Sequence, residues 1–194
     1  MPETVIGCGE YLSQSYVRSL NLSAENLNYV VVSREVKVIE SDAFKDCLIK
    51  SLVFQGDSEL ICLEEHAFRY SSVESIRIPA SCSWIGASAF EAAPLKDVSF
   101  EYGSKLERIS ESAFAKTALE HLVIPASVSS IDRLAFSECS LESITFEPGS
   151  RLKRIGFHAF GESKHGHTFQ KWVWNQLEVS SSSASKKNLC IQIL

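Results

Sequence analysis

LEHLVIPASVSSIDRLAFSECSLESITFEPGSRLKRIGFHAF, from Leu119 to Phe160, contains the pattern on which the fold of this chain depends. The dipeptide Ala-Phe recurs in it, with a hydrophobic residue four positions before each Ala. The whole chain has six copies, at successive spacings of 24, 22, 24, 22 and 24 residues. A period of this length predicts a solenoid, in which each repeat packs only against its neighbours. The copies end at Phe44, Phe68, Phe90, Phe114, Phe136 and Phe160.

Two unit lengths alternate along the chain. The short unit, Leu119 to Phe136, has a predicted strand that ends in Ile-Pro, whereas in the long unit, Leu141 to Phe160, the strand ends in Phe. The long unit also carries a wider turn, in which Gly103 and Gly149 stand where a positive φ costs little. Asp57 takes that place in another long unit, and Asp tolerates this conformation better than most residues.

Each unit opens with an apolar residue, two variable residues, an apolar residue, a variable residue and a further apolar residue. The last apolar pair alternates as in a strand, so both side chains lie on one face. Stacked units bury that face in a parallel sheet with ~4.8 Å between strands. The Ile-x-x-x-Ala-Phe segment then returns along the outer side as a turn or short helix. An ordinary α/β domain needs longer, mostly helical connections, and Pro79 and Pro125 in mid-unit argue against these.

The quoted stretch resembles the BspA-type leucine-rich repeats, also called the Treponema pallidum type, which are found in surface proteins of oral and gut bacteria and of protozoa such as Trichomonas and Entamoeba. The resemblance extends over about Leu27 to Phe160, with the Ile-Pro strand end and the Ala-Phe return in register several times. It implies a leucine-rich-repeat solenoid with a curved parallel β-sheet on the concave side, and turns and short helices on the convex side. It also implies roles in adhesion or host-protein binding, at the cell surface, and no catalytic residues.

The chain ends differ from the repeats. Residues 1–26 are predicted to form a partly helical N-terminal cap, because apolar residues at helical spacing favour an amphipathic helix from Tyr11 to Leu20. The six repeats occupy 27–160, and the first of them is degenerate, with Ser33 where a proline stands in other short units.

Residues 161–179 are predicted to form a C-terminal capping strand region. Phe169, Trp172 and Trp174 repeat the strand pattern with bulkier side chains, which either cover the last layer or form an aromatic binding patch. Residues 180–194 are predicted to be a Ser-rich linker and tail.

Composition limits the classes of partner. The formal net charge is -5, from 19 Lys and Arg against 24 Asp and Glu, and no basic run is present. Nucleic acid is therefore not an expected partner. No apolar stretch is long enough for direct membrane insertion, and neither a signal peptide nor a membrane anchor is recognisable in this sequence.

Few residues suggest chemistry. The six cysteines are too sparse for a disulfide scaffold and show no zinc-type pair, so Cys47 and Cys139 are interpreted as small buried hydrophobes. A bond between Cys62 and Cys82 is not expected but stays open. His158, His165 and His167, together with Cys139, suggest a metal-dependent enzyme only weakly, and a solvated loop is the favoured interpretation for His165 and His167. We expect no cofactor, no metal and no catalytic site.

The predicted function is a non-catalytic protein–protein interaction module, with a cell-surface adhesin or antigen as the version that the resemblance implies. The protein ligand is expected on the concave face, where the variable strand positions point away from the core. These residues could also serve only to solubilise the sheet and fix its pairing. A structural segment of a longer repeat array, with self-association through the solenoid ends, is the alternative. The candidate residues are Tyr29, Lys50, Val53, Glu74, Arg77, Lys96, Asp97, Ser99, Glu120, His121, Val123, Glu142 and Thr145.

Overall fold

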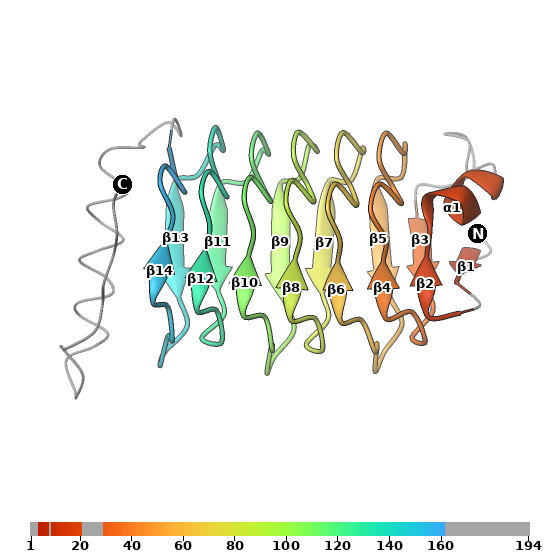
Figure 1. The fold of residues 1–194 in the computed structure, drawn as a ribbon, viewed down its shortest axis with the longest axis horizontal. Coiled ribbons are helices and arrows are strands. Elements are labelled where there is room, and N and C mark those ends of the chain that lie inside the picture. The colour runs from red at the N-terminus through yellow and green to blue at the C-terminus, as the bar shows by residue number, and fades with distance from the viewer. Residues whose placement is uncertain (1–3, 8, 21–28, 162–194) are drawn as a thin grey trace.

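The computed structural model describes residues 4–7, 9–20 and 29–161, and they form a parallel β-solenoid (Figure 1). Each of the six repeats contributes one long strand, one short strand and a tight turn that contains the Ala-Phe dipeptide, whereas the first coil, with β1 and β2, is followed by the helix α1. The solenoid predicted from the repeat is therefore confirmed. No helix among the described residues has the length and apolar character needed to span a bilayer.

The long and short strands form two separate ladders. The short strands make one sheet in the order β14-β12-β10-β8-β6-β4-β2. The long strands make a five-stranded sheet, β1-β3-β5-β7-β9, and a two-stranded continuation, β11-β13. The long strands are β1 (Thr4–Ile6), β3 (Tyr29–Val32), β5 (Ser51–Phe54), β7 (Ser75–Ile78), β9 (Asp97–Phe100), β11 (His121–Ile124) and β13 (Ser143–Phe146). The short strands are β2 (Tyr11–Leu12), β4 (Val38–Ile39), β6 (Cys62–Leu63), β8 (Trp84–Ile85), β10 (Arg108–Ile109), β12 (Ser130–Ile131) and β14 (Arg154–Ile155).

All the paired strands are parallel, and equivalent positions of successive repeats face one another across the ladder. Leu52 is paired with Ile76, and Ile76 with Val98, so the apolar strand positions form a continuous buried row. The short strands contribute a second buried row through Ile85, Ile109 and their equivalents. The core is thus an elongated interior between the two ladders.

The Ala-Phe dipeptides form a column through this interior. The six Phe rings are fully buried and stack with centroids 4.9 to 5.4 Å apart and interplanar angles of 1° to 6°. Backbone hydrogen bonds also connect the Ala-Phe turns, here called corners, of successive coils. The N–H of Phe90 donates to the carbonyl of Ala113 at 2.7 Å, and the other coils repeat this bond. Ala leaves room for the next coil to approach, and Phe fills the space inside it. The predicted regular file of Phe rings is confirmed.

The return segment between the short strand and the Phe column is a turn, and the described residues of the six repeats contain no helix there. The turn contains left-handed residues four positions apart, such as His66 at φ 59° and Tyr70 at φ 55°. Such a conformation costs roughly 1–2 kcal/mol for a residue with a Cβ. The short strands and these left-handed residues replace the short helices expected on the convex side.

Turn chemistry in the long units follows the prediction. Gly103 and Gly149 have φ values of 76° and 79°, and Asp57 adopts φ 57° at the equivalent position.

The N-terminal segment differs from the predicted helix. Tyr11 and Leu12 belong to β2 and pair with β4, and the helix α1 covers only Gln14–Ser19. Leu12 is buried in the core row, and the Oγ of Ser13 accepts the N–H of Tyr16 at 3.2 Å, which starts the helix. The helical spacing of apolar residues was misleading at Leu12, since that side chain serves the sheet. The strand β1 was also not predicted. The described residues end at 161, so the predicted capping strand with Phe169, Trp172 and Trp174, and the tail, lie outside them.

Candidate functional site

The long strands present the predicted binding residues on one surface, here called the long-strand face. Its members lie in the strands β3 to β13 or immediately before them. All are exposed except Glu74, which is half-buried. The members are Tyr29, Lys50, Val53, Glu74, Arg77, Lys96, Asp97, Ser99, Glu120, His121, Val123, Glu142 and Thr145.

Three apolar side chains stand out on this face. Tyr29, Val53 and Val123 are 43%, 38% and 53% exposed. Thr145, which is also exposed, is paired with Val123 across the ladder, so the two side chains lie next to each other on the face. Apolar side chains within a charged surround are the usual composition of a protein-binding surface.

One pair of neighbouring residues on this face carries opposite charges, as expected if these residues help to fix the pairing of the strands. Lys96 Nζ lies 3.1 Å from Glu74 Oε2, and the hydrogen bond from Lys96 is the main cause that lowers the pKa of Glu74 below its ordinary value. The charge of Lys50 also lowers this pKa, although within residues 29–161 Lys50 forms no ion pair with Glu74. The same residues contain no ion pair between Lys96 and Glu120, which lie on either side of the break between β9 and β11.

The C-terminal half of the face has an excess of acidic groups. Asp97, Glu120 and Glu142 are exposed and form no ion pair with the described residues. His121 Nδ1 lies 2.8 Å from the Oγ of Ser143, which orients the imidazole across two strands. This half therefore offers carboxylates to a partner.

The described cysteines are free thiols with a packing role. Burial raises the pKa of Cys82 to about 12 and that of Cys139 to about 11. The thiol of Cys139 also donates to the carbonyl of Phe114 at 3.0 Å. Cys139 is buried as predicted, whereas Cys47 is only half-buried. Protonated thiols are poor nucleophiles and poor metal ligands.

Metal-binding chemistry has no support in the part of the chain that the structure describes, where no group of three or more His, Cys, Asp or Glu side chains could hold an ion. His165 and His167 lie outside that part.

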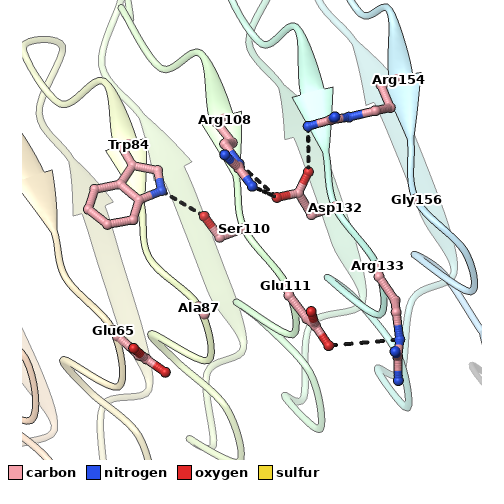
Figure 2. Close-up of a pocket in the computed structure, with 10 residues that line it drawn as sticks. All are labelled: Glu65, Trp84, Ala87, Arg108, Ser110, Glu111, Asp132, Arg133, Arg154 and Gly156. Carbon is pink, nitrogen blue, oxygen red and sulfur yellow. Dashed lines mark hydrogen bonds and ion pairs between the residues drawn. The ribbon is translucent and has the colours of Figure 1, made fainter.

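The short strands carry a second surface feature, which the sequence reasoning missed. It is a hollow of about 550 Å³, here called the short-strand depression (Figure 2). Its walls come from the short strands β8, β10 and β14 and from the turns that follow β6, β8, β10, β12 and β14. The lining residues are Glu65, Trp84, Ala87, Arg108, Ser110, Glu111, Asp132, Arg133, Arg154 and Gly156.

One carboxylate organises the polar wall of the depression. Asp132 Oδ2 accepts from Arg108 Nε at 2.7 Å, and Asp132 Oδ1 accepts from an Arg154 Nη at 3.1 Å. The Oγ of Ser130 donates to Asp132 Oδ1 at 2.9 Å. The side chain of Asp132 is only 12% exposed, whereas those of Arg108 and Arg154 are 54% and 59% exposed. The two guanidinium groups are thus held in place and still reach solvent.

The other wall is aromatic. The indole Nε1 of Trp84 donates to the Oγ of Ser110 at 2.6 Å, which fixes the ring at the edge of the depression (Figure 2). Gly156 lies directly against the preceding coil, where an added Cβ would clash with the backbone nitrogen of Arg133. The sequence did contain a signal, since Trp84, Arg108, Ser130 and Arg154 each precede the Ile of an Ile-x-x-x-Ala-Phe segment.

Comparison with known proteins identifies relatives of the repeat region. The family model of the BspA-type leucine-rich repeat region matches six copies, over residues 22–142 and 107–170. The crystal structure of the pneumococcal vaccine antigen PcpA is similar at 26% identity with a TM-score of 0.64, over 69% of this chain. This chain accounts for 42% of that antigen's length. A leucine-rich cell surface protein from Faecalibacterium prausnitzii A2-165 matches at 18% identity with a TM-score of 0.35, over 70% of this chain and 39% of its own. No curated protein matches the chain.

Proposed function

Because the chain belongs to the BspA-type leucine-rich repeat family, we propose that it is a protein-interaction module without a catalytic site, which binds a protein partner across the long-strand face. Repeat solenoids use their extended strand surfaces for recognition. The partner is a protein that buries the exposed apolar side chains of this face and places groups of opposite charge next to its charged side chains.

The observation that carries this proposal is the placement of Tyr29, Val53 and Val123. Tyr29 and Val53 are exposed on the neighbouring strands β3 and β5, and Val123 is exposed on β11, further along the same face. Polar and charged residues lie beside all three. Apolar anchors at the centre of a polar rim supply most of the binding energy in protein interfaces. The unpaired carboxylates Asp97 and Glu142 favour a partner with basic groups opposite the C-terminal half.

A surface adhesin or antigen is the more specific form of the proposal. Two things support it: the family includes surface proteins, and the similar PcpA is a pneumococcal vaccine antigen. The chain spans less than half of that antigen, so the proposed role is that of a repeat region.

Binding to a panel of purified extracellular-matrix proteins, measured on a surface that carries the whole chain, tests the proposal. The variant Val53→Glu/Val123→Glu is expected to weaken the strongest interaction by about tenfold or more, since each change places a charge at an exposed apolar position of the face. Ile61→Glu is the matched control, because Ile61 is 48% exposed but lies next to β6, away from this face. Equal binding by the double variant and the wild type contradicts the use of the long-strand face.

A second candidate role is stacking into a longer repeat array. It is favoured by the position of β14, which among the described strands is paired only on the side of β12. An edge strand is a ready template for further pairing. Sedimentation velocity across a range of protein concentrations tests this role, and a monomer throughout the range contradicts it.

A further inference from the structure

We propose that the short-strand depression binds a neutral, linear oligosaccharide, with one sugar ring on Trp84 and the following rings extending towards Arg154. This site lies on the other ladder from the long-strand face and does not depend on the protein partner proposed there.

The charges that line the depression balance. The lining contains three guanidinium groups and three carboxylates, so its net charge is zero and a strongly ionic ligand gains no net attraction from it. Donors and acceptors instead lie side by side, which suits hydroxyl groups, because each hydroxyl both donates and accepts. The guanidinium groups belong to Arg108, Arg133 and Arg154, and the carboxylates to Glu65, Glu111 and Asp132.

Trp84 supplies the platform for a sugar ring. Its side chain is part of the lining, and the residue is 37% exposed although its N–H is already bonded to Ser110. The bond leaves the indole face as the surface offered to a ligand. The C–H groups of a pyranose ring carry a slight positive charge, and they pack on the electron-rich face of an aromatic ring.

The polar groups are arranged before any ligand arrives. Asp132 holds Arg108 and Arg154 in one orientation, and Arg133 Nε lies 3.8 Å from Glu111 Oε1. Figure 2 shows these side chains projecting from neighbouring coils around the hollow. Groups that are fixed in advance lose little conformational entropy on binding. The volume of about 550 Å³ is within the range of small-ligand sites.

The spacing of the coils selects a linear chain of sugars. Trp84, Arg108, Ser130 and Arg154 are in register on successive strands, so three intervals of ~4.8 Å give ~14 Å from the first to the last. A chain of β-linked pyranose rings advances by a similar distance per ring, so successive rings meet successive coils. An extended peptide advances by only ~3.3 Å per residue and loses this register.

The test uses the whole chain and follows the indole N–H signal of Trp84 by ¹⁵N NMR, assigned through its loss in Trp84→Phe. Chitotriose and cellotriose are the probes, and sodium glucuronate and an acidic heptapeptide are the comparison ligands. At least one trisaccharide is expected to shift the Trp84 signal in a saturable manner, with a dissociation constant of roughly 0.1–1 mM.

Variants identify the site, with binding measured by saturation-transfer NMR on the sugar. Trp84→Ala is expected to weaken binding at least about tenfold. Tyr11→Ala is the matched control, since Tyr11 is 60% exposed in the same row of the sheet but lies outside the depression, and its binding should equal that of the wild type. The guanidinium of Arg154 lies against Ser130 and Asp132, in the coil that the third ring meets. Arg154→Gln changes an exposed side chain and is therefore expected to weaken binding about fivefold without loss of folding.

Three outcomes overturn the proposal. In the first, neither trisaccharide shifts the Trp84 signal. In the second, Trp84→Ala and Arg154→Gln, both folded by circular dichroism, bind as the wild type does. In the third, glucuronate or the peptide binds more tightly than both trisaccharides. None of these outcomes bears on the long-strand face, so the two proposals fail separately.

Discussion

The rings of Phe90 and Phe114 lie 5.1 Å apart with an angle of 6° between their planes, although 24 residues separate them in the sequence. Both are fully buried, and each is also stacked on its other side. The column therefore couples every coil to the next, and a gap in it affects two interfaces at once.

Phe114→Ala is expected to lower the free energy of unfolding by about 3–5 kcal/mol, because it opens a cavity between two coils. Urea denaturation followed by circular dichroism measures the change. Phe157→Ala is the control, since Phe157 is 46% exposed, and it should change the stability by less than about 1 kcal/mol. Similar losses in both variants argue against a special role for the column.

Gly86→Ala is expected to destabilise the chain by about 2 kcal/mol or more through overpacking. An added Cβ would stand 2.6 Å from the carbonyl carbon of Glu64 in the preceding coil, where backbone cannot move aside cheaply. Gly56→Ala is the matched control, since nothing lies within 4 Å of its added Cβ. Thermal unfolding of the two variants compares them, and equal midpoints contradict the predicted clash.

Ala92→Gly is expected to raise the free energy of unfolding by about 1 kcal/mol, since Ala92 adopts φ 56° and glycine adopts this conformation without strain. Ala126→Gly, at a half-buried turn position without a positive φ, should instead lower it by about 0.5–1 kcal/mol. Urea denaturation of both variants measures the two signs. A loss of stability in Ala92→Gly contradicts the account of the turn.

Stability is expected to fall as the pH rises above 9. Burial raises the pKa of Cys82 from 9.0 to about 12, so the unfolded chain loses this proton at a lower pH than the folded chain does. The stabilising effect is complete below pH 9 and is lost progressively towards pH 12. Cys82→Ala should reduce this slope by up to about 1.4 kcal/mol per pH unit. Urea denaturation across this range gives the slopes for both chains, and equal slopes contradict the prediction.

The fold could be predicted because the same pattern of apolar strand positions and Ala-Phe dipeptides recurs in every repeat. The Ala-Phe spacing gave the Phe column, and Gly103, Gly149 and Asp57 gave the wide turns, since these depend on local residue chemistry and on a period. The prediction that the helix includes Leu12 was wrong. An apolar residue at this position fits both the spacing of an amphipathic helix and the buried position of a strand. Only the pairing of β2 with β4 distinguishes the two.

The candidate sites were predicted less completely. The long-strand face follows from alternation within a strand, so its residues could be assigned, but whether they bind a partner stays a prediction. Trp84, Arg108 and Arg154 become neighbours only when the short strands are in register. Two-residue strands carry too little periodicity for sequence reasoning to detect them.

The stacking of near-identical corners has a consequence for how such a chain can change over generations. Each Ala-Phe corner contacts only the corners directly before and after it. Unequal recombination that removes or duplicates one short coil together with one long coil would join two corners of matching shape. A single recombination event can thus change the number of coils in the solenoid, and the Phe rings on either side of the new junction can still stack on each other.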